Sequence, residues 1–183
     1  MDEWIAGFAR QGWHDQFAVL VQVAYAMLLG GAIGVEREIK NRPAGFRTHM
    51  LVAGAAALLV GLGDLLANHY VARSGHDILR LDAMRLISAV VSAVGFLGAG
   101  AIFRRGGDRD GVSGLTTAAS LLMVATIGIA VGVGAHLLAL GVTALALAVL
   151  VLLGWLERRA GTRHGRRDPG GERIRRSRSP PAP

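Results

Sequence analysis

Long apolar blocks, rather than amphipathic stripes, dominate the pattern of this chain, and charged residues gather in the segments between them. Apolar blocks of roughly 18 residues or more are typical of helices that cross a membrane. The pattern therefore predicts an all-α, polytopic helical membrane protein with about five transmembrane helices. The predicted spans are residues 17–35, 48–66, 84–103, 115–134 and 137–156.

Two terminal segments lie outside these spans. Residues 1–16 contain Trp4 and Trp13, and because Trp favours the membrane interface, we expect an N-terminal interfacial segment. Residues 157–183 are rich in Arg, Gly, Ser and Pro, a composition that builds no apolar core and predicts a disordered tail. Residues 17–156 between them are predicted to form the transmembrane domain.

The distribution of positive charge predicts the orientation. The net charge is +7, and 16 of the 20 Lys and Arg residues fall in residues 36–47, 104–109 and the tail. Since Lys and Arg are enriched in cytoplasmic loops, we expect an N-terminus outside and a cytoplasmic C-terminus. The tail has no aromatic residues for base stacking, so lipid headgroups, rather than nucleic acid, are its expected partner.

Polar residues gather where three predicted spans meet the cytoplasmic water layer. One interpretation is a polar cluster that binds an ion, a substrate or a partner. The alternative is that the threonines cap helices or bond back to carbonyls, with Thr48 as the N-cap of its span. The cluster consists of Glu36, Arg37, Arg47, Thr48, Thr116 and Thr117, and His49 lies next to it in the sequence.

Two carboxylates in this region are candidate metal ligands. Glu36 and Glu38 supply the hard oxygens that Mg²⁺ prefers, but residues two positions apart point to different faces of a helix. The alternative is a solvated helix end in which Glu36 pairs with Lys40 at the i, i+4 spacing. The chain has no Cys, no P-loop motif and no evident Ser/His/Asp arrangement, so we expect no enzymatic activity and no cofactor, with Mg²⁺ as the single candidate ligand.

Two further features concern structure. Asp82 and Arg85 are spaced for an outer ion pair, with a pathway entrance near Asp64 as the alternative. Small residues let helices approach closely in lipid, so glycines are predicted to form the helix contacts. These packing glycines are Gly30, Gly34, Gly95, Gly98, Gly100, Gly128 and Gly132.

Three sequence blocks together resemble the membrane domain of the MgtC/SapB family: GGAIGVERE…PAGFRTHMLV at residues 30–52, DAMR…VVSAVGFLGAGAI at residues 82–102, and VSGLTTAAS…ATIGIAVGVG at residues 112–134. The resemblance covers residues 17–156. The chain departs from the family pattern at Ala89, Ala93 and Leu122, where Gln, Gly and Trp are usual. In place of the soluble C-terminal domain of longer members, we expect only the basic tail. The resemblance implies site residues at Glu36, Arg37, Glu38, Ala44, Gly45, Arg47, Thr48, Asp82, Arg85, Gly95, Gly98, Gly100, Thr116 and Thr117.

The same resemblance implies a multi-pass protein of the bacterial inner membrane, linked to growth at low Mg²⁺ and, in some pathogens, to survival in host cells. Its activity is expected to be modulation of other membrane complexes, such as the ATP synthase. The alternative is direct transport of Mg²⁺ or another ion. Ion pathways through lipid need polar partners, and only Asp64 comes close to the interior of a span, which favours modulation. The lipid bilayer and a second copy of the chain are further expected partners.

Overall fold

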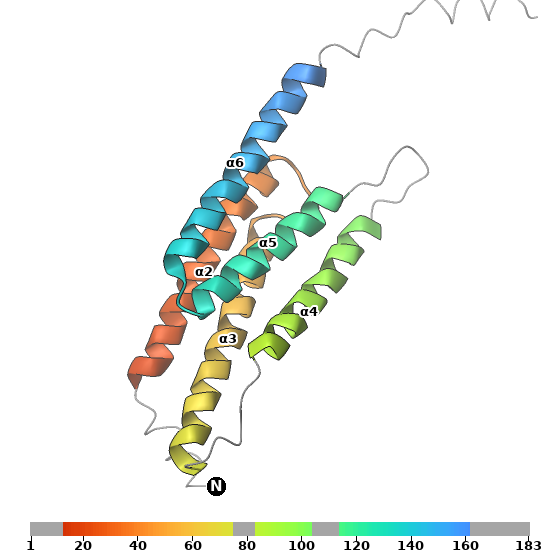
Figure 1. The fold of residues 1–183 in the computed structure, drawn as a ribbon. Helices are drawn as coiled ribbons and strands as arrows, with labels where there is room; N and C mark the ends of the chain where they lie inside the picture. The colour runs from red at the N-terminus through yellow and green to blue at the C-terminus, as the bar shows by residue number, and fades with distance from the viewer. Residues whose placement is uncertain (1–12, 75–82, 104–113, 162–183) are drawn as a thin grey trace, which may run out of the picture. The chain divides into compact units, whose positions relative to one another are not determined.

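The structure is a computed structural model that describes residues 13–74, 83–103 and 114–161. Five helices make up most of these residues. No strand occurs within those ranges, so the all-α prediction is confirmed. The helices, labelled in Figure 1, are α2 (Trp13–Ile39), α3 (Phe46–Ser74), α4 (Ala83–Phe103), α5 (Leu115–Gly132) and α6 (His136–Gly161).

Four of these helices are long and apolar enough to cross a membrane. They are α2, the Phe46–Asn68 part of α3, the Met84–Ile102 part of α4, and α5. In α6 the apolar stretch is shorter, His136–Leu152. Large apolar side chains such as Phe96 and Leu137 are more than four-fifths exposed. A multi-pass membrane protein explains this exposure, because lipid covers those side chains.

Several helix ends differ from the predicted spans. Helix α3 continues to Ser74 instead of ending at residue 66, because residues 67–74 contain neither Gly nor Pro and Gly75 follows. Helix α6 runs past residue 156 to Gly161, because residues 157–160 contain neither Gly nor Pro. Helix α2 begins at Trp13, inside the segment predicted to be interfacial. The rest of that segment and most of the predicted tail lie outside the described residues.

The chain divides into two compact units, residues 1–148 and 149–183. The second unit contains the C-terminal part of α6, in which the Arg159 guanidinium lies 3.9 Å from the centroid of the Trp155 ring. This is the geometry of a cation–π contact. The first unit contains α2 to α5 and the beginning of α6, and the candidate site lies in it.

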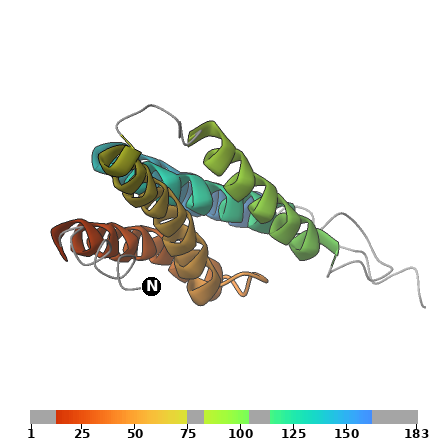
Figure 2. The same ribbon diagram turned by 90° about the horizontal axis from the view of Figure 1, so that it is seen from below.

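Within the first unit, α3 packs against α2 and α5, and α5 also contacts α2 and α4. Figures 1 and 2 show α5 between α4 and the pair formed by α2 and α3. The buried side chains at these contacts are mostly small, which brings the helix axes close together. One buried apolar cluster consists of Ala44, Ala56, Val60, Val90, Val94, Leu121, Ala125 and Ile129.

Glycines bring α2 and α5 against α3. A Cβ atom at Gly30 would lie 2.7 Å from the Ala53 Cβ, and one at Gly34 would lie 2.7 Å from the Phe46 Cα. On α5, a Cβ atom at Gly128 would overlap the Ala53 carbonyl oxygen, and one at Gly132 would lie 2.7 Å from the Val60 Cβ. The structure therefore places all four predicted packing glycines where even a methyl group lacks room.

Helix α4 is packed less closely. A Cβ atom at Gly98 would lie 3.2 Å from the Ala118 Cβ of α5, but no atom lies within 4 Å of the equivalent position at Gly95 or Gly100. The close contact predicted for Gly95 and Gly100 is therefore wrong for the described chain. Gly100 is about 200° around the helix from Gly98 and points away from α5. Gly95 shares the face of Gly98, but α5 comes close to that face only at Gly98.

Two helix ends have the same backbone geometry. After α2, Asn41 takes a left-handed conformation with φ 51°, its N–H donates to the Glu38 carbonyl, and the Arg42 N–H donates to the Arg37 carbonyl. After α5, Gly134 has φ 80° and its N–H donates to the Val131 carbonyl. These are Schellman motifs, which end a helix sharply. They explain why short connections suffice to return the chain into α3 and α6.

The glycine contacts predict opposite effects of the same substitution at two positions. Gly128→Ala should destabilise the protein by about 1–3 kcal/mol, because the new methyl overlaps the Ala53 carbonyl. Gly95→Ala should be neutral or stabilise it by up to about 1 kcal/mol, because Ala is the better helix former and the site is open. Thermal unfolding of both variants in the same detergent measures the difference, and equal melting temperatures would contradict the contact.

Candidate functional site

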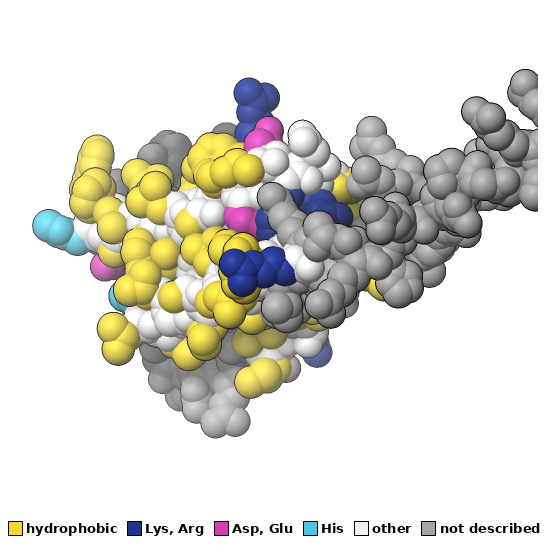
Figure 3. All heavy atoms as spheres, turned by 90° about the horizontal axis from the view of Figure 1, so that it is seen from above, with side chains coloured by type: hydrophobic (Ala, Val, Ile, Leu, Met, Phe, Trp, Pro, Cys, Tyr) yellow, Lys and Arg dark blue, Asp and Glu magenta, His cyan; other side chains and the backbone are white. Residues whose placement is uncertain are grey.

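Most of the predicted polar cluster lies at the end of the bundle where α2 ends and α3 and α5 begin, which we call the junction end. Figure 3 views the molecule from this end and shows Lys, Arg, Asp and Glu side chains among apolar ones, beside atoms drawn in grey. The last turn of α2 supplies Glu36, Arg37 and Glu38, and the first turn of α3 supplies Arg47, Thr48 and His49. The first turn of α5 supplies Thr116 and Thr117.

Glu36 is the centre of an ion-pair group at the end of α2. One carboxylate oxygen accepts from the Nε and Nη2 of Arg37, and the other pairs with the Lys40 Nζ. The pair with Lys40 has the i, i+4 spacing that the sequence predicts. Both oxygens of Glu36 therefore face cationic partners within its own helix end.

Arg37 is an unusually buried charged residue, with 2% of its surface exposed. Its Nη1 atom is buried and has no hydrogen-bond partner among the residues that the structure describes. Leaving a donor of a charged group unsatisfied away from water is unfavourable. Among the described residues, only the ion pair with Glu36 offsets the free-energy cost of burying the Arg37 guanidinium. The two side chains therefore act as one unit.

Glu38 caps the next helix. Its Oε2 accepts a hydrogen bond of 2.9 Å from the backbone N–H of Phe46, the first residue of α3. A Cβ atom at residue 45 would overlap the same oxygen, so any other residue there would displace the Glu38 carboxylate from this position. A carboxylate at a helix N-terminus satisfies a free N–H group and interacts favourably with the helix dipole. The prediction that Thr48 is the N-cap is therefore wrong, because α3 begins two residues earlier.

His49 connects three segments and is fully buried. Its Nδ1 lies 2.9 Å from the carbonyl oxygen of Gly45, in the turn before α3. Its Nε2 lies 3.0 Å from the Ser120 Oγ on α5. The Ser120 hydroxyl in turn donates to the Thr117 carbonyl at 2.8 Å. A polar chain thus runs from the turn before α3, through α3, to the first turns of α5.

The hydrogen bonds around His49 restrict the protons on its ring. A carbonyl oxygen only accepts, so Nδ1 must carry a proton toward Gly45. While the Ser120 hydroxyl donates to Thr117, its oxygen accepts from Nε2, which gives the ring both protons. A neutral ring requires the hydroxyl to turn from the carbonyl of Thr117 to Nε2. The bonds from His49 to Gly45 and Ser120 are thus kept in either protonation state, whereas the bond from Ser120 to Thr117 is made only with the doubly protonated ring.

The remaining members of the predicted cluster separate into two groups. Thr117 is buried, with 1% of its surface exposed, and its carbonyl belongs to the polar chain from His49. Arg47, Thr48 and Thr116 are exposed. The structure therefore brings Glu36 and Arg37 together inside, and leaves an outward-facing set at the same end of the bundle.

The two candidate metal ligands have separate partners. Glu36 faces Arg37 and Lys40, and Glu38 accepts from the Phe46 backbone. Nowhere in residues 13–74, 83–103 and 114–161 do three or more His, Asp or Glu side chains gather in a way that could hold a metal ion. Mg²⁺ binding by Glu36 and Glu38 stays a prediction.

The predicted outer ion pair cannot be compared with the structure, because Asp82 lies outside the described residues. Arg85 is exposed near the beginning of α4, and Asp64 is exposed on α3. The pair therefore also stays a prediction.

The functional geometry that sequence reasoning missed is the polar chain through His49 and Ser120. Their partnership joins residues that are 71 positions apart. One local signal was present: His49 follows Gly45 at the i, i+4 spacing, directly at the beginning of an apolar helix. An imidazole there reaches a free carbonyl of the preceding turn.

Comparison with known proteins identifies the family of this chain. The model of the MgtC family matches residues 23–159, which include the helices that carry the junction end. The chain belongs to the MgtC family. The resemblance seen in the sequence is thereby confirmed. A search of solved structures found no match to the chain.

Three curated proteins are similar to this chain over most of its length. Protein SapB of Bacillus subtilis is 33% identical over 149 residues, which are 81% of this chain and 62% of SapB. The putative magnesium transporter YhiD of Escherichia coli K12 is 35% identical over 138 residues, 73% of this chain and 58% of YhiD. Protein MgtC of Brucella abortus is 40% identical over 131 residues, 72% of this chain and 49% of that protein. The chain thus spans about half to three fifths of the length of these relatives.

The polar chain predicts a graded loss of stability. His49→Leu removes the bonds to Gly45 and Ser120 at similar volume, so it should lower the free energy of unfolding by about 1–3 kcal/mol. Ser120→Ala leaves the bond to Gly45 and should lower it by about 0.5–1.5 kcal/mol. Unfolding of the purified variants by added SDS measures both values. A His49→Leu protein as stable as the wild type would show that His49 does not join α3 to α5.

Proposed function

We propose that this chain acts in Mg²⁺ homeostasis as a non-enzymatic modulator of other complexes in the bacterial inner membrane. The positive-charge distribution supports an N-terminus outside and a cytoplasmic tail, which puts the junction end on the cytoplasmic side. The activity needs no cofactor of its own. The ATP synthase is one candidate for the complex that is modulated.

The link to Mg²⁺ is supported by family membership and by the names of two relatives, Protein MgtC and the putative magnesium transporter YhiD. The choice of modulation over transport rests on the packing described above. Glycines bring α2 and α5 into contact with the backbone of α3 along the middle of the first unit. Backbone contact of this kind leaves no space for a hydrated ion between those helices.

The junction end offers the features of an interaction surface. Buried His49 joins the beginning of α3 to Ser120 of α5, and Glu38 joins the end of α2 to the first residue of α3. Arg47, Thr48 and Thr116 are exposed above them. A guanidinium offers paired donors in a fixed plane, which suits a carboxylate on a partner protein. We therefore assign partner binding to the exposed set and structural support to the buried set.

Ion flux distinguishes modulation from the alternative, direct transport. The purified chain is reconstituted into liposomes that contain a Mg²⁺-sensitive dye, and external Mg²⁺ is added. Modulation predicts a rate equal to that of protein-free liposomes, with an added ionophore as the positive control. Saturable Mg²⁺ entry in proportion to the amount of protein would establish transport and overturn the proposal.

A second test separates the exposed from the buried set. Arg47→Lys should impair growth at low Mg²⁺ while membrane abundance stays near that of the wild type, because Lys keeps the charge but loses the planar pair of donors. His49→Leu should instead lower the abundance, since it acts on stability. Arg158→Lys, in the basic C-terminal region, is the control and should have no effect. Normal growth of Arg47→Lys at full abundance would remove the case for a surface at this end.

A further inference from the structure

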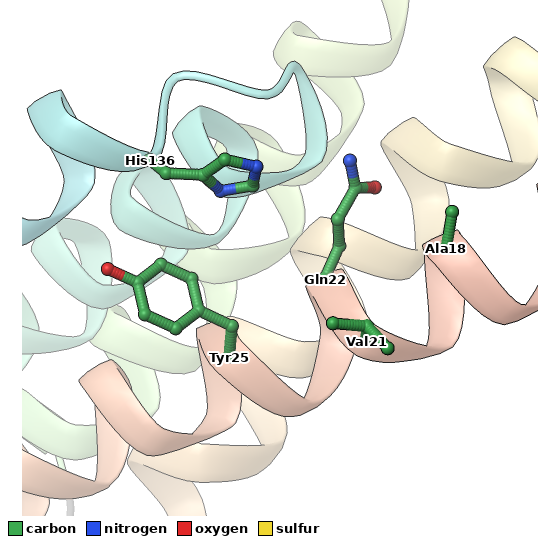
Figure 4. A pocket seen from close by; sticks show the side chains of 5 residues that line it. All are labelled: Ala18, Val21, Gln22, Tyr25 and His136. Carbon is green, nitrogen blue, oxygen red and sulfur yellow. The ribbon is translucent and has the colours of Figure 1, made fainter.

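A separate cavity lies away from the junction end, between α2 and the first residue of α6. Its volume is about 480 Å³, and it is lined by Ala18, Val21, Gln22 and Tyr25 of α2 and by His136. Figure 4 shows the side chains of Gln22 and His136 pointing toward one another across it. The rings of Tyr25 and His136 meet edge to face, with centroids 5.7 Å apart. This contact holds the imidazole at the wall of the cavity.

Three polar groups at this cavity lack partners in the described chain. Neither the Gln22 amide, the Tyr25 hydroxyl nor the His136 ring forms a hydrogen bond with any residue in the described ranges. Gln22 is half-buried and lies about 8 Å along the helix from residue 17, where the predicted span begins. His136 is exposed and directly precedes the predicted span 137–156, so these groups lie at the membrane boundary, where lipid ester and phosphate oxygens are found.

The surroundings of these polar groups are apolar and exposed. Phe17 and Val21 on α2 and Leu137 and Leu138 on α6 are each more than half exposed. Such a surface is expected to face acyl chains. The cavity therefore combines an apolar wall with the polar groups of Gln22 and His136, while the Tyr25 hydroxyl points away from Gln22. An apolar wall with a few polar groups suits an amphipathic ligand.

We propose that this cavity binds one membrane phospholipid. The ester and phosphate oxygens of the lipid accept hydrogen bonds from the Gln22 amide and an N–H of His136, and an acyl chain lies along Ala18 and Val21. A second copy of the chain is the poorer occupant, because the backbone carbonyls of a spanning helix are already used in its own hydrogen bonds. A glycerol–phosphate group instead presents several acceptor oxygens within a few ångströms.

Native mass spectrometry of the full chain tests this proposal. The protein is stripped of lipid in detergent, and phosphatidylglycerol is then added in steps. The wild type should retain one phosphatidylglycerol more tightly than any further one. Gln22→Leu and His136→Leu should each weaken that first binding about tenfold, the effect of one lost hydrogen bond to a charged or polar acceptor. His136→Gln keeps an N–H donor and should retain most of the affinity.

Thr126→Leu is the matched control, because it removes an exposed polar group from α5 whose hydroxyl bonds only within its own helix turn. It should bind phosphatidylglycerol like the wild type. Unchanged first binding in both Gln22→Leu and His136→Leu, with melting temperatures also unchanged, would overturn the proposal. So would equal loss in Thr126→Leu, which would indicate a nonspecific annulus of lipid.

A cysteine substitution distinguishes lipid from a second copy of the chain. The sequence has no Cys, so Val21→Cys provides a single thiol at the wall of the cavity. In membranes treated with an oxidant, lipid occupancy predicts a monomer on a non-reducing gel. An efficient disulfide-linked dimer would instead place a second copy at this cavity and contradict the proposal.

Discussion

The contacts in which glycines of α2 and α5 meet the backbone of α3 determine the geometry of the first unit. In lipid there is little hydrophobic drive between helices, so close packing must hold them together. Gly30 and Gly34 make this possible between α2 and α3, and Gly128 and Gly132 do so between α5 and α3. The ends of three helices are thereby brought within hydrogen-bonding distance of one another.

The polar chemistry at the junction end depends on that approach. His49 reaches Ser120 because α3 and α5 lie close, and Glu38 reaches the Phe46 N–H because a Schellman motif at Asn41 turns the chain back sharply. Arg37 is buried in the same region with Glu36 as its partner. These groups connect the ends of the helices, while Arg47 and Thr116 remain exposed. This division is the structural basis for proposing modulation of another complex.

The sequence predicts the helices and the family well because both depend on local pattern. Apolar blocks separated by charged turns identify the spans, and the i, i+4 spacing of Gly30 and Gly34 identifies a contact face. Glycine content alone does not say which face meets a neighbour, and Gly95 was assigned a contact that α5 does not provide. The roles of Glu38 and His49 depend on a turn conformation and on a residue of another helix. No local pattern contains that information, so only the folded arrangement reveals them.

A double-mutant cycle between α3 and α5 tests the central contact most directly. Gly132→Ala places a methyl against the Val60 Cβ, and Val60→Gly removes that Cβ. If the two positions touch, the free energy of unfolding of the double variant will exceed the additive value by about 1 kcal/mol or more, because the second substitution makes room for the first. Strict additivity of the two single substitutions would show that α3 and α5 do not meet there, and would contradict the account.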